Sequence, residues 1–332
     1  MIMIKEQLKK HEFYLVIVII LLVIFFTINT DKFLTLGNLL DLLNSYSFLA
    51  IMSAGMLVVL ISGGIDLSFT AMVTVAEYAI AYIIINQSGN FLFASIIAVV
   101  VGTLLGSFNA LIIYFFRAPA LIVTIATLNI YYGFIILITK GKWIYNFPEW
   151  FKEVRYIIEF TSTNGTKYGI TFPLLLLFLV LILTYFILNY TMLGRKIFTL
   201  GGNREAARRM GFNLFLITLF VYSFMGFLAG IGAITHVLIV QTVQANAVVG
   251  RELEVIAAVV LGGTSLAGGK GTLLGTVLGV ILIAIMWNGM VLIGISSYWH
   301  QVIIGLIILI SVISSAYSSR KGILGGTKID VE

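Results

Sequence analysis

Residues 13–30 read FYLVIVIILLVIFFTINT, a stretch without a charged side chain. A helix needs about 20 mostly apolar residues to cross a bilayer, so this stretch is long enough to span it. It lacks a cleavage site of small residues, and we interpret it as a first transmembrane helix rather than a removed signal peptide. Further apolar stretches follow at residues 45–62, 69–86, 91–116, 119–139, 172–189, 213–239, 253–268, 272–294 and 298–317. The sequence therefore predicts an all-α, polytopic membrane protein with about ten transmembrane helices.

The overall composition indicates that the solvent of this protein is lipid. The 332 residues are 60% hydrophobic and 10% charged, with a mean hydropathy of +1.10, whereas soluble domains are about 25% charged. The absence of cysteine excludes disulfides, thiolate chemistry and cysteine-ligated metals. The three histidines lie far apart and form no His-Glu-x-x-His pair. We therefore predict no catalytic site, metal site or cofactor on this chain.

The charge pattern predicts the orientation in the membrane. The net charge of +6 indicates basic cytoplasmic loops rather than nucleic-acid binding. With the N-terminus inside, an even number of crossings returns the C-terminus to the cytoplasm, and most basic residues then lie inside. The predicted parts are a cytoplasmic tail 1–12, a transmembrane domain 13–317 and a cytoplasmic tail 318–332. The transmembrane domain includes an extracytoplasmic segment 140–171 and a cytoplasmic segment 190–213.

The outer segment 140–171 carries Trp143 and Trp150 among alternating charges. One interpretation is an interfacial amphipathic piece that the tryptophans anchor at the headgroups. The other is a docking surface for an external partner. The residues leave both open.

Glycine pairs interrupt two of the apolar stretches. Residues 58–68 read VVLISGGIDLS and residues 259–267 read VVLGGTSLA, so each predicts a helix that ends and restarts. The stretch 253–268 is short and glycine-rich, and we predict that it is broken or re-entrant. Such breaks build polar substrate sites in transporters, although simple structural repetition explains them nearly as well. Small residues four apart predict close helix packing at Gly102 and Gly106, Gly226 and Gly230, and Gly271, Gly275 and Gly279.

Lys270 lies in the sequence GGKGT at residues 268–272, which is not a phosphate-binding loop. That loop requires glycine, four residues and then Gly-Lys-Ser/Thr, but Thr264 and Gly271 break the pattern. No other segment qualifies. If nucleotide energy is used, another chain must bind the nucleotide.

Glu77 lies inside the apolar stretch 69–86. An ionised carboxylate is expensive in a membrane, so an intramembrane acid indicates function by default. A protonated or hydrogen-bonded contact between helices is the competing interpretation. His236 and His300 are interpreted as interfacial or packing residues.

The most hydrophilic internal segment predicts a short capped helix. Asn203 is a good N-cap, Glu205 lies in the first turn and Arg208 in the last, and Gly211 can end the helix. This helix either lies on lipid headgroups or enters a groove of a soluble partner.

Four segments in order resemble the membrane permease of bacterial ABC importers for ribose and related monosaccharides. They are SGGIDLS at 62–68, PALIVTIATL at 119–128, GGNREAAR at 201–208 and ELEVIAAVVLGGTSLAGGKG at 252–271. The resemblance covers about residues 40–315. Two departures are Glu77, where the family usually has a small residue, and Ala110, where glycine is common.

The resemblance implies an ABC importer permease fold at the bacterial plasma membrane and a division of labour. Two permease subunits, identical or paired with a relative, would form the pathway. Two cytoplasmic ATPase subunits would bind ATP and Mg²⁺, and an extracytoplasmic binding protein would deliver the sugar. The residues implied to couple to the ATPase are Gly202, Asn203, Glu205, Ala206, Ala207, Arg208 and Gly211.

Polar residues near the helix breaks are the candidates for lining or supporting the sugar path. These are Asp66, Ser68 and Asn129, with Glu77 as a weaker one. A second hypothesis is a proton-coupled secondary transporter that uses Glu77 as proton carrier. A third is a non-transporting membrane scaffold, and a permease for autoinducer-2 within the same family stays open as well.

Overall fold

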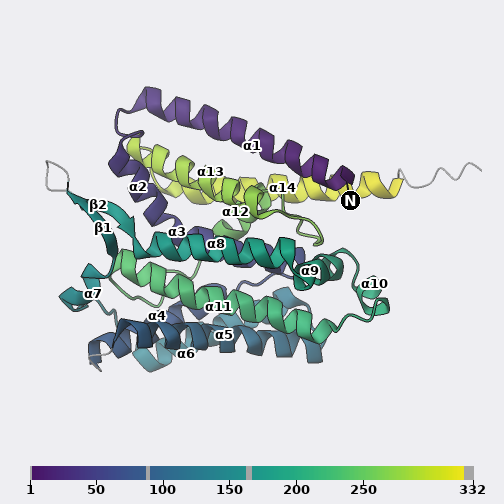
Figure 1. Cartoon of the computed structure of the whole chain (residues 1–332), viewed down its shortest axis with the longest axis horizontal. Helices are drawn as coiled ribbons and strands as arrows, with labels where there is room; N and C mark the ends of the chain where they lie inside the picture. Colours follow the sequence, from purple (N-terminus) through teal and green to yellow (C-terminus); the bar gives the residue numbers. More distant parts are fainter. Residues whose placement is uncertain (1, 87–89, 162–166, 325–332) are drawn as a thin grey trace, which may run out of the picture.

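The computed structural model describes residues 2–86, 90–161 and 167–324, and these are mostly helical (Figure 1). The helices run roughly along the long axis of the molecule. They are α1 Ile2–Asn29, α2 Leu36–Ser45, α3 Ser47–Ile61, α4 Phe69–Asn86, α5 Phe91–Phe115, α6 Ala120–Thr139, α7 Glu149–Glu153, α8 Phe172–Tyr190, α9 Met192–Gly202, α10 Arg204–Arg209, α11 Leu214–Val240, α12 Glu252–Leu261, α13 Leu273–Leu292 and α14 Tyr298–Leu324. Two strands, β1 Tyr156–Thr161 and β2 Lys167–Thr171, lie at one end of the bundle, and α10 lies at the other. These ends are called the hairpin end and the α10 end.

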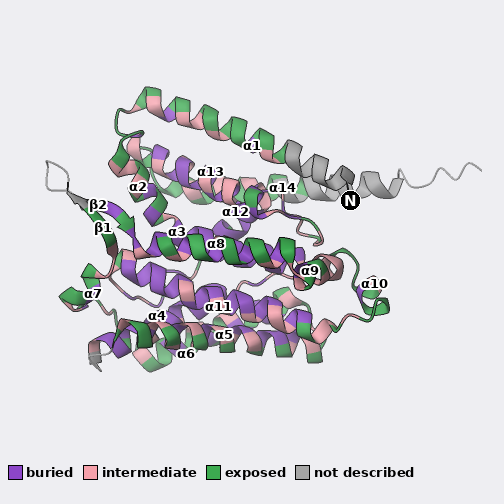
Figure 2. Ribbon diagram, viewed as in Figure 1, coloured by how far each residue is buried: buried purple, intermediate pink, exposed green. Residues whose placement is uncertain are grey.

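The core of the bundle lies around α3, which is buried along its whole length. A helix that is hydrophobic on all sides must be enclosed by other helices, and α8, α11, α12 and α13 pack around α3 (Figure 2). In contrast, α1 carries large exposed apolar side chains such as Phe13, Leu21 and Phe25. Outward apolar side chains of this kind are typical of helices that face lipid.

The prediction of about ten crossings is not confirmed. Six helices in the described ranges are long and apolar enough to cross a membrane, namely α1 from His11, α5, α6, α8, α11 and α13. A seventh crossing results if α2 and α3, which bend by 43° at their junction, form one span. The helix predicted over 253–268 is shorter, because α12 stops at Leu261 and a turn-rich loop follows. The helix α1 begins at Ile2, inside the segment predicted as a tail.

The close helix packing predicted from spaced glycines is confirmed for α5, α11 and α13, except that Gly271 precedes α13. In α5 and α11, Gly102 and Gly106 lie against Gly226 and Gly230, and a Cβ added at Gly226 would be 2.1 Å from the carbonyl oxygen of Gly102. In α13, a Cβ added at Gly279 would lie 2.1 Å from a carbonyl oxygen of α12. The small residues therefore bring the backbones together, as membrane helices require.

The expectation of an all-α fold is wrong at one place, the segment between α6 and α8. There β1 and β2 pair antiparallel, with Tyr156 opposite Thr171 and Glu159 opposite Gly169. The sequence of β1, YIIEFT, is rich in the aromatic and β-branched residues that favour strands. A second pairing joins this region to the loop after α11, since Ile144 and Val243 exchange backbone hydrogen bonds.

Candidate functional site: the α10 end and the helix breaks

The helix α10 forms a capped, charged turn at the α10 end. The side chain of Asn203 accepts a hydrogen bond of 2.9 Å from the backbone N–H of Ala206. Glu205 pairs with Arg208 at 3.3 Å and with Arg209 at 3.4 Å, while Ala207 packs inward and is fully buried. Gly211 follows with a positive φ of 75°. The predicted cap, charges and terminating glycine therefore all take the expected local conformation.

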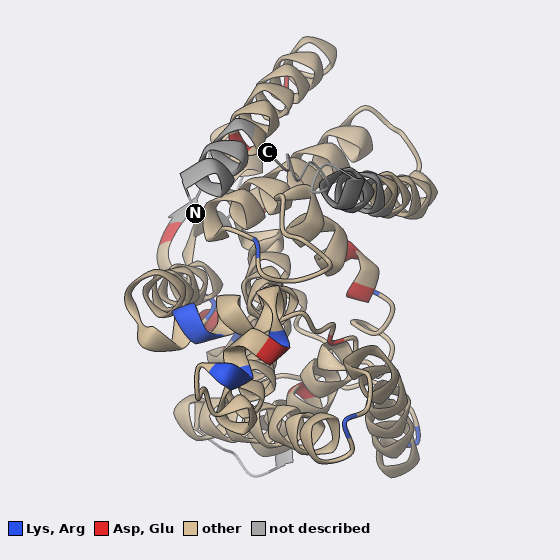
Figure 3. Cartoon of the chain, turned by 90° about the vertical axis from the view of Figure 1, so that its right-hand side faces the viewer, with Lys and Arg blue, Asp and Glu red and all other residues tan. Residues whose placement is uncertain are grey.

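The charged residues of α10 lie at the end of the molecule that faces the viewer in Figure 3. The exposed fractions are 51% for Glu205, 71% for Arg208 and 79% for Arg209. Exposed ion pairs of this kind contribute only about 0–1 kcal/mol to stability. The charges therefore contribute little to stability. Because they are exposed, they are accessible to a partner.

Two glycine-containing loops meet the end of α9, next to α10. The backbone N–H of Gly269 donates to the carbonyl oxygen of Ile61 at 2.9 Å. A Cβ added at Gly201 would lie 1.8 Å from that same oxygen, and one added at Gly268 would lie 2.8 Å from the Cα of Gly63. The loops after the two similar sequence breaks thus touch each other and the end of α9. A cavity of about 550 Å³ opens beside them, with Gly64 and Tyr222 in its wall.

Asp66 and Ser68 lie together in the first break and are fully buried. One carboxylate oxygen of Asp66 accepts from the Ser68 backbone N–H at 2.8 Å and from its hydroxyl at 2.6 Å. The amide of Asn109 donates to the Ser68 hydroxyl at 2.7 Å, and Tyr131 donates to the Asn109 carbonyl at 3.1 Å. Burial raises the pKa of Asp66, in the loop outside the helices, to about 6. These contacts hold the break in shape, with α5 and α6 as its walls.

Glu77 of α4 meets His236 of α11 in the interior. The distance from the carboxylate Oε1 to Nδ1 of His236 is 2.6 Å, and the side chains are 0% and 8% exposed. The ring of Phe48 lies beside the imidazole, with centroids 5.2 Å apart. Histidine 236 is therefore a buried partner of Glu77, and the prediction of a packing or interfacial residue did not foresee this pairing.

Asn129 lies apart from the other predicted path residues. It is exposed on α6, and its side-chain amide donates to the carbonyl oxygen of Ile125 in the same helix at 2.8 Å. The structure thus brings Asp66 and Ser68 together and places Glu77 and Asn129 elsewhere.

Sequence reasoning missed two acidic residues at the start of α12 and their partners on distant helices. Glu252, at the start of α12, is hydrogen-bonded by the hydroxyl of Thr70 at the start of α4. Glu254, two residues further along, accepts from the indole N–H of Trp287 at 3.0 Å. The sequence feature that could have indicated them is a pair of acidic residues, separated by one residue, at the start of the apolar stretch. No group of three or more acidic or histidine side chains within the described ranges is placed to hold a metal ion.

Comparison with known proteins gives matches over most of the chain. The profile of the family described as "Branched-chain amino acid transport system / permease component" matches residues 38–312. The ribose import permease protein RbsC of Escherichia coli (strain K12) is 34% identical over 284 residues, which cover 86% of this chain and 87% of the relative. RbsC of Bacillus subtilis (strain 168) is 32% identical over 291 residues, or 88% of each chain.

A relative with a different name matches less of its own length. The autoinducer 2 import system permease protein LsrC of Yersinia pseudotuberculosis serotype IB (strain PB1/+) is 29% identical over 267 residues, which cover 80% of this chain and 73% of the relative. No solved structure matches the chain significantly.

Proposed function

Because the chain belongs to the family of permease components of branched-chain amino acid transport systems, we propose that it is the membrane subunit of an ABC importer for a ribose-like monosaccharide. The observation that carries the proposal is the similarity to ribose import permeases over more than four fifths of the chain. Membership of a permease family favours a transport subunit over an enzyme. The autoinducer-2 alternative has the weaker support, since that relative is less similar.

On this proposal, the ATPase subunit contacts the permease at α10 and couples ATP hydrolysis to transport there. The coupling residues are Gly202, Asn203, Glu205, Ala206, Ala207, Arg208 and Gly211. The outward charges and the fully buried Ala207 support this role, because one side of α10 is anchored in the bundle while the other is accessible. A short, capped helix with one accessible face suits a groove on a soluble partner.

The proposed assembly contains more than this chain. Two permease subunits form the path, two ATPase subunits bind ATP and Mg²⁺, and a binding protein delivers the sugar from outside. The chain lies in the bacterial inner membrane with both termini in the cytoplasm. The sequence supports the division of labour because it has no phosphate-binding loop.

Four polar residues are the candidates for lining or supporting the sugar path. Asp66 and Ser68 keep the first break in its conformation through the hydrogen bonds to Asn109. Glu77 joins α4 to α11 through His236, and Asn129 is the remaining candidate for contact with the sugar. A path of this kind binds weakly, because high affinity belongs to the delivery protein and the channel must release its cargo.

Transport by the reconstituted complex tests the proposal. The chain is purified with its ATPase and binding protein, placed in proteoliposomes and supplied with labelled D-ribose, other pentoses and hexoses, or autoinducer-2. We expect uptake of a monosaccharide that requires ATP and the binding protein and is unaffected by a protonophore. Uptake without ATP that a protonophore abolishes would instead establish the proton-coupled transporter that uses Glu77.

A further inference from the structure

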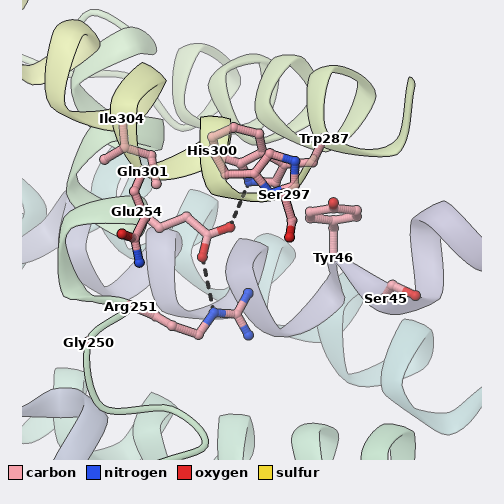
Figure 4. Close-up of a pocket in the computed structure, with 10 residues that line it drawn as sticks. All are labelled: Ser45, Tyr46, Gly250, Arg251, Glu254, Trp287, Ser297, His300, Gln301 and Ile304. Carbon is pink, nitrogen blue, oxygen red and sulfur yellow. Dashed lines mark hydrogen bonds and ion pairs between the residues drawn. The ribbon is translucent and has the colours of Figure 1, made fainter. Parts of the chain in front are cut away.

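A second cavity lies between the junction of α2 and α3, α12, α13 and the start of α14 (Figure 4). Its volume is about 470 Å³, and small-molecule sites in proteins occupy roughly 300–1,000 Å³. At the rim, Gln301 is exposed, whereas the floor residues Glu254 and Trp287 are only 9% and 4% exposed. The cavity therefore has an open mouth and a buried polar floor.

The polar groups of the floor hold one another in place. The two carboxylate oxygens of Glu254 accept from the Trp287 indole N–H and from Nε of Arg251, each at 3.0 Å. The guanidinium of Arg251 also lies over the ring of Phe48, 5.4 Å from its centre. A carboxylate offers about four acceptor sites and a guanidinium five N–H donors. Both groups thus keep unused hydrogen-bonding capacity in a fixed orientation.

Aromatic rings form one wall of the cavity. The rings of Trp287 and His300 stack with centroids 4.1 Å apart and an angle of 26° between their planes. Tyr46 lies beside them and lines the same cavity (Figure 4). Within the described residues, Nε2 of His300 is buried and has no hydrogen-bond partner.

These observations select the class of ligand. The charges of Arg251 and Glu254 neutralise each other, so the floor favours a neutral molecule over an anion or a cation. The floor offers both donors and acceptors, which suits vicinal hydroxyl groups, and the ring wall can lie against the apolar C–H face of a sugar. Ile304 is the only aliphatic side chain among the described lining residues, which disfavours a branched-chain amino acid.

We propose that the cavity formed by Arg251, Glu254, Trp287 and His300 is a monosaccharide-binding subsite of the transport path. This proposal rests on the proposed function as a sugar permease. Arg251 and Glu254 hydrogen-bond the sugar hydroxyls, and the stacked rings of Trp287 and His300 form the wall against which its apolar face lies.

The helix α12 connects this subsite to the α10 end. Arg251 and Glu254 lie at the beginning of α12, whose ten residues extend over about 15 Å. The loop after α12 includes Gly268 and Gly269, which touch Gly201 and Gly202 of α9. A displacement of α9 and α10 would therefore move Arg251 and Glu254 through the short helix α12. This movement would weaken the binding of the sugar.

Uptake by variants tests the subsite in the complete complex. We expect Glu254→Gln and His300→Leu each to lower the rate of D-ribose uptake about tenfold or more, because the first loses a hydrogen-bond acceptor for the sugar and the second loses the ring that stacks on Trp287. ATP hydrolysis should still rise when loaded binding protein is added. Trp299→Leu is the matched control, since this exposed neighbour on α14 does not line the cavity. Wild-type uptake by both variants would overturn the subsite and leave the permease function standing.

Tryptophan fluorescence tests binding directly in the full chain in lipid nanodiscs. Replacing Trp143, Trp150 and Trp299 by Phe leaves Trp287 as the only tryptophan of the four. We expect D-ribose to change its emission saturably, and L-leucine at the same concentration to have no effect. An unresponsive Trp287, or an equal response to L-leucine, would overturn the subsite. This readout needs no transport, so it separates failure of the subsite from failure of the proposed function.

Discussion

Glu77 and His236 form a deeply buried acid–histidine pair. It joins α4 to α11 in the core, where replacing either partner alone leaves a polar group facing Phe48 and other apolar neighbours. The cost of breaking a buried pair on one side far exceeds the cost of replacing both partners with apolar residues. The pair therefore acts first as a fixed link between two helices.

We expect His236→Leu to destabilise the protein by about 3 kcal/mol, because it leaves the Glu77 carboxyl buried without its partner. The double variant Glu77→Met/His236→Leu should recover at least half of that loss. Thermal unfolding in one detergent, followed for both variants and the wild type, measures the difference. A single variant as stable as wild type, or a double variant less stable than the single one, would contradict this account.

Glu77 also illustrates the limits of prediction at the residue scale. The intramembrane position marks this acid from the sequence alone, and its burial follows from the apolar residues around it. Its partner is 159 positions away on α11 (236 − 77), and no local pattern specifies which face of α11 turns toward α4. The same holds for Glu254, whose partner Trp287 belongs to another helix.

At the scale of elements, the glycine steps of α5 and α11 determine how closely two helices approach. The spacing of Gly102, Gly106, Gly226 and Gly230 predicts a packing face, and the structure shows the two pairs packed on each other. Apolar length likewise predicts α4, α5, α6, α8, α11 and α13 to within one or two residues. The hairpin is different, because its short strands lie in a charged segment whose pattern also suits an amphipathic helix.

We expect Gly226→Ala to destabilise the bundle by about 1–3 kcal/mol, the usual cost of overpacking a close contact. The new Cβ would lie 2.1 Å from the carbonyl oxygen of Gly102, and backbone cannot move aside as a side chain can. Gly133→Ala in α6 is the matched control, since nothing lies within 4 Å of a Cβ there, and alanine favours the helix. Equal melting temperatures for the two variants would show that the α5–α11 contact is loose.

At the scale of the whole molecule, the structure separates two regions and joins them by α12. Charged, accessible side chains lie at α10, and a polar cavity lies between α12, α13 and α14. The charge pattern and the family resemblance predict the first region. The second could not be predicted, because its walls come from the junction of α2 and α3 and from three helices far along the chain. Only packing brings these segments together.

The most direct test of the central claim, that this permease is driven through α10, is the number of sugar molecules imported per ATP hydrolysed by the complex in proteoliposomes. We predict that Glu205→Ala/Arg208→Ala lowers this ratio at least tenfold, since charged anchors in an interface contribute about 2 kcal/mol or more. The control is Glu149→Ala/Lys152→Ala, which removes an exposed ion pair of the same spacing at the hairpin end and should leave the ratio unchanged. A wild-type ratio in the α10 double variant would contradict the account.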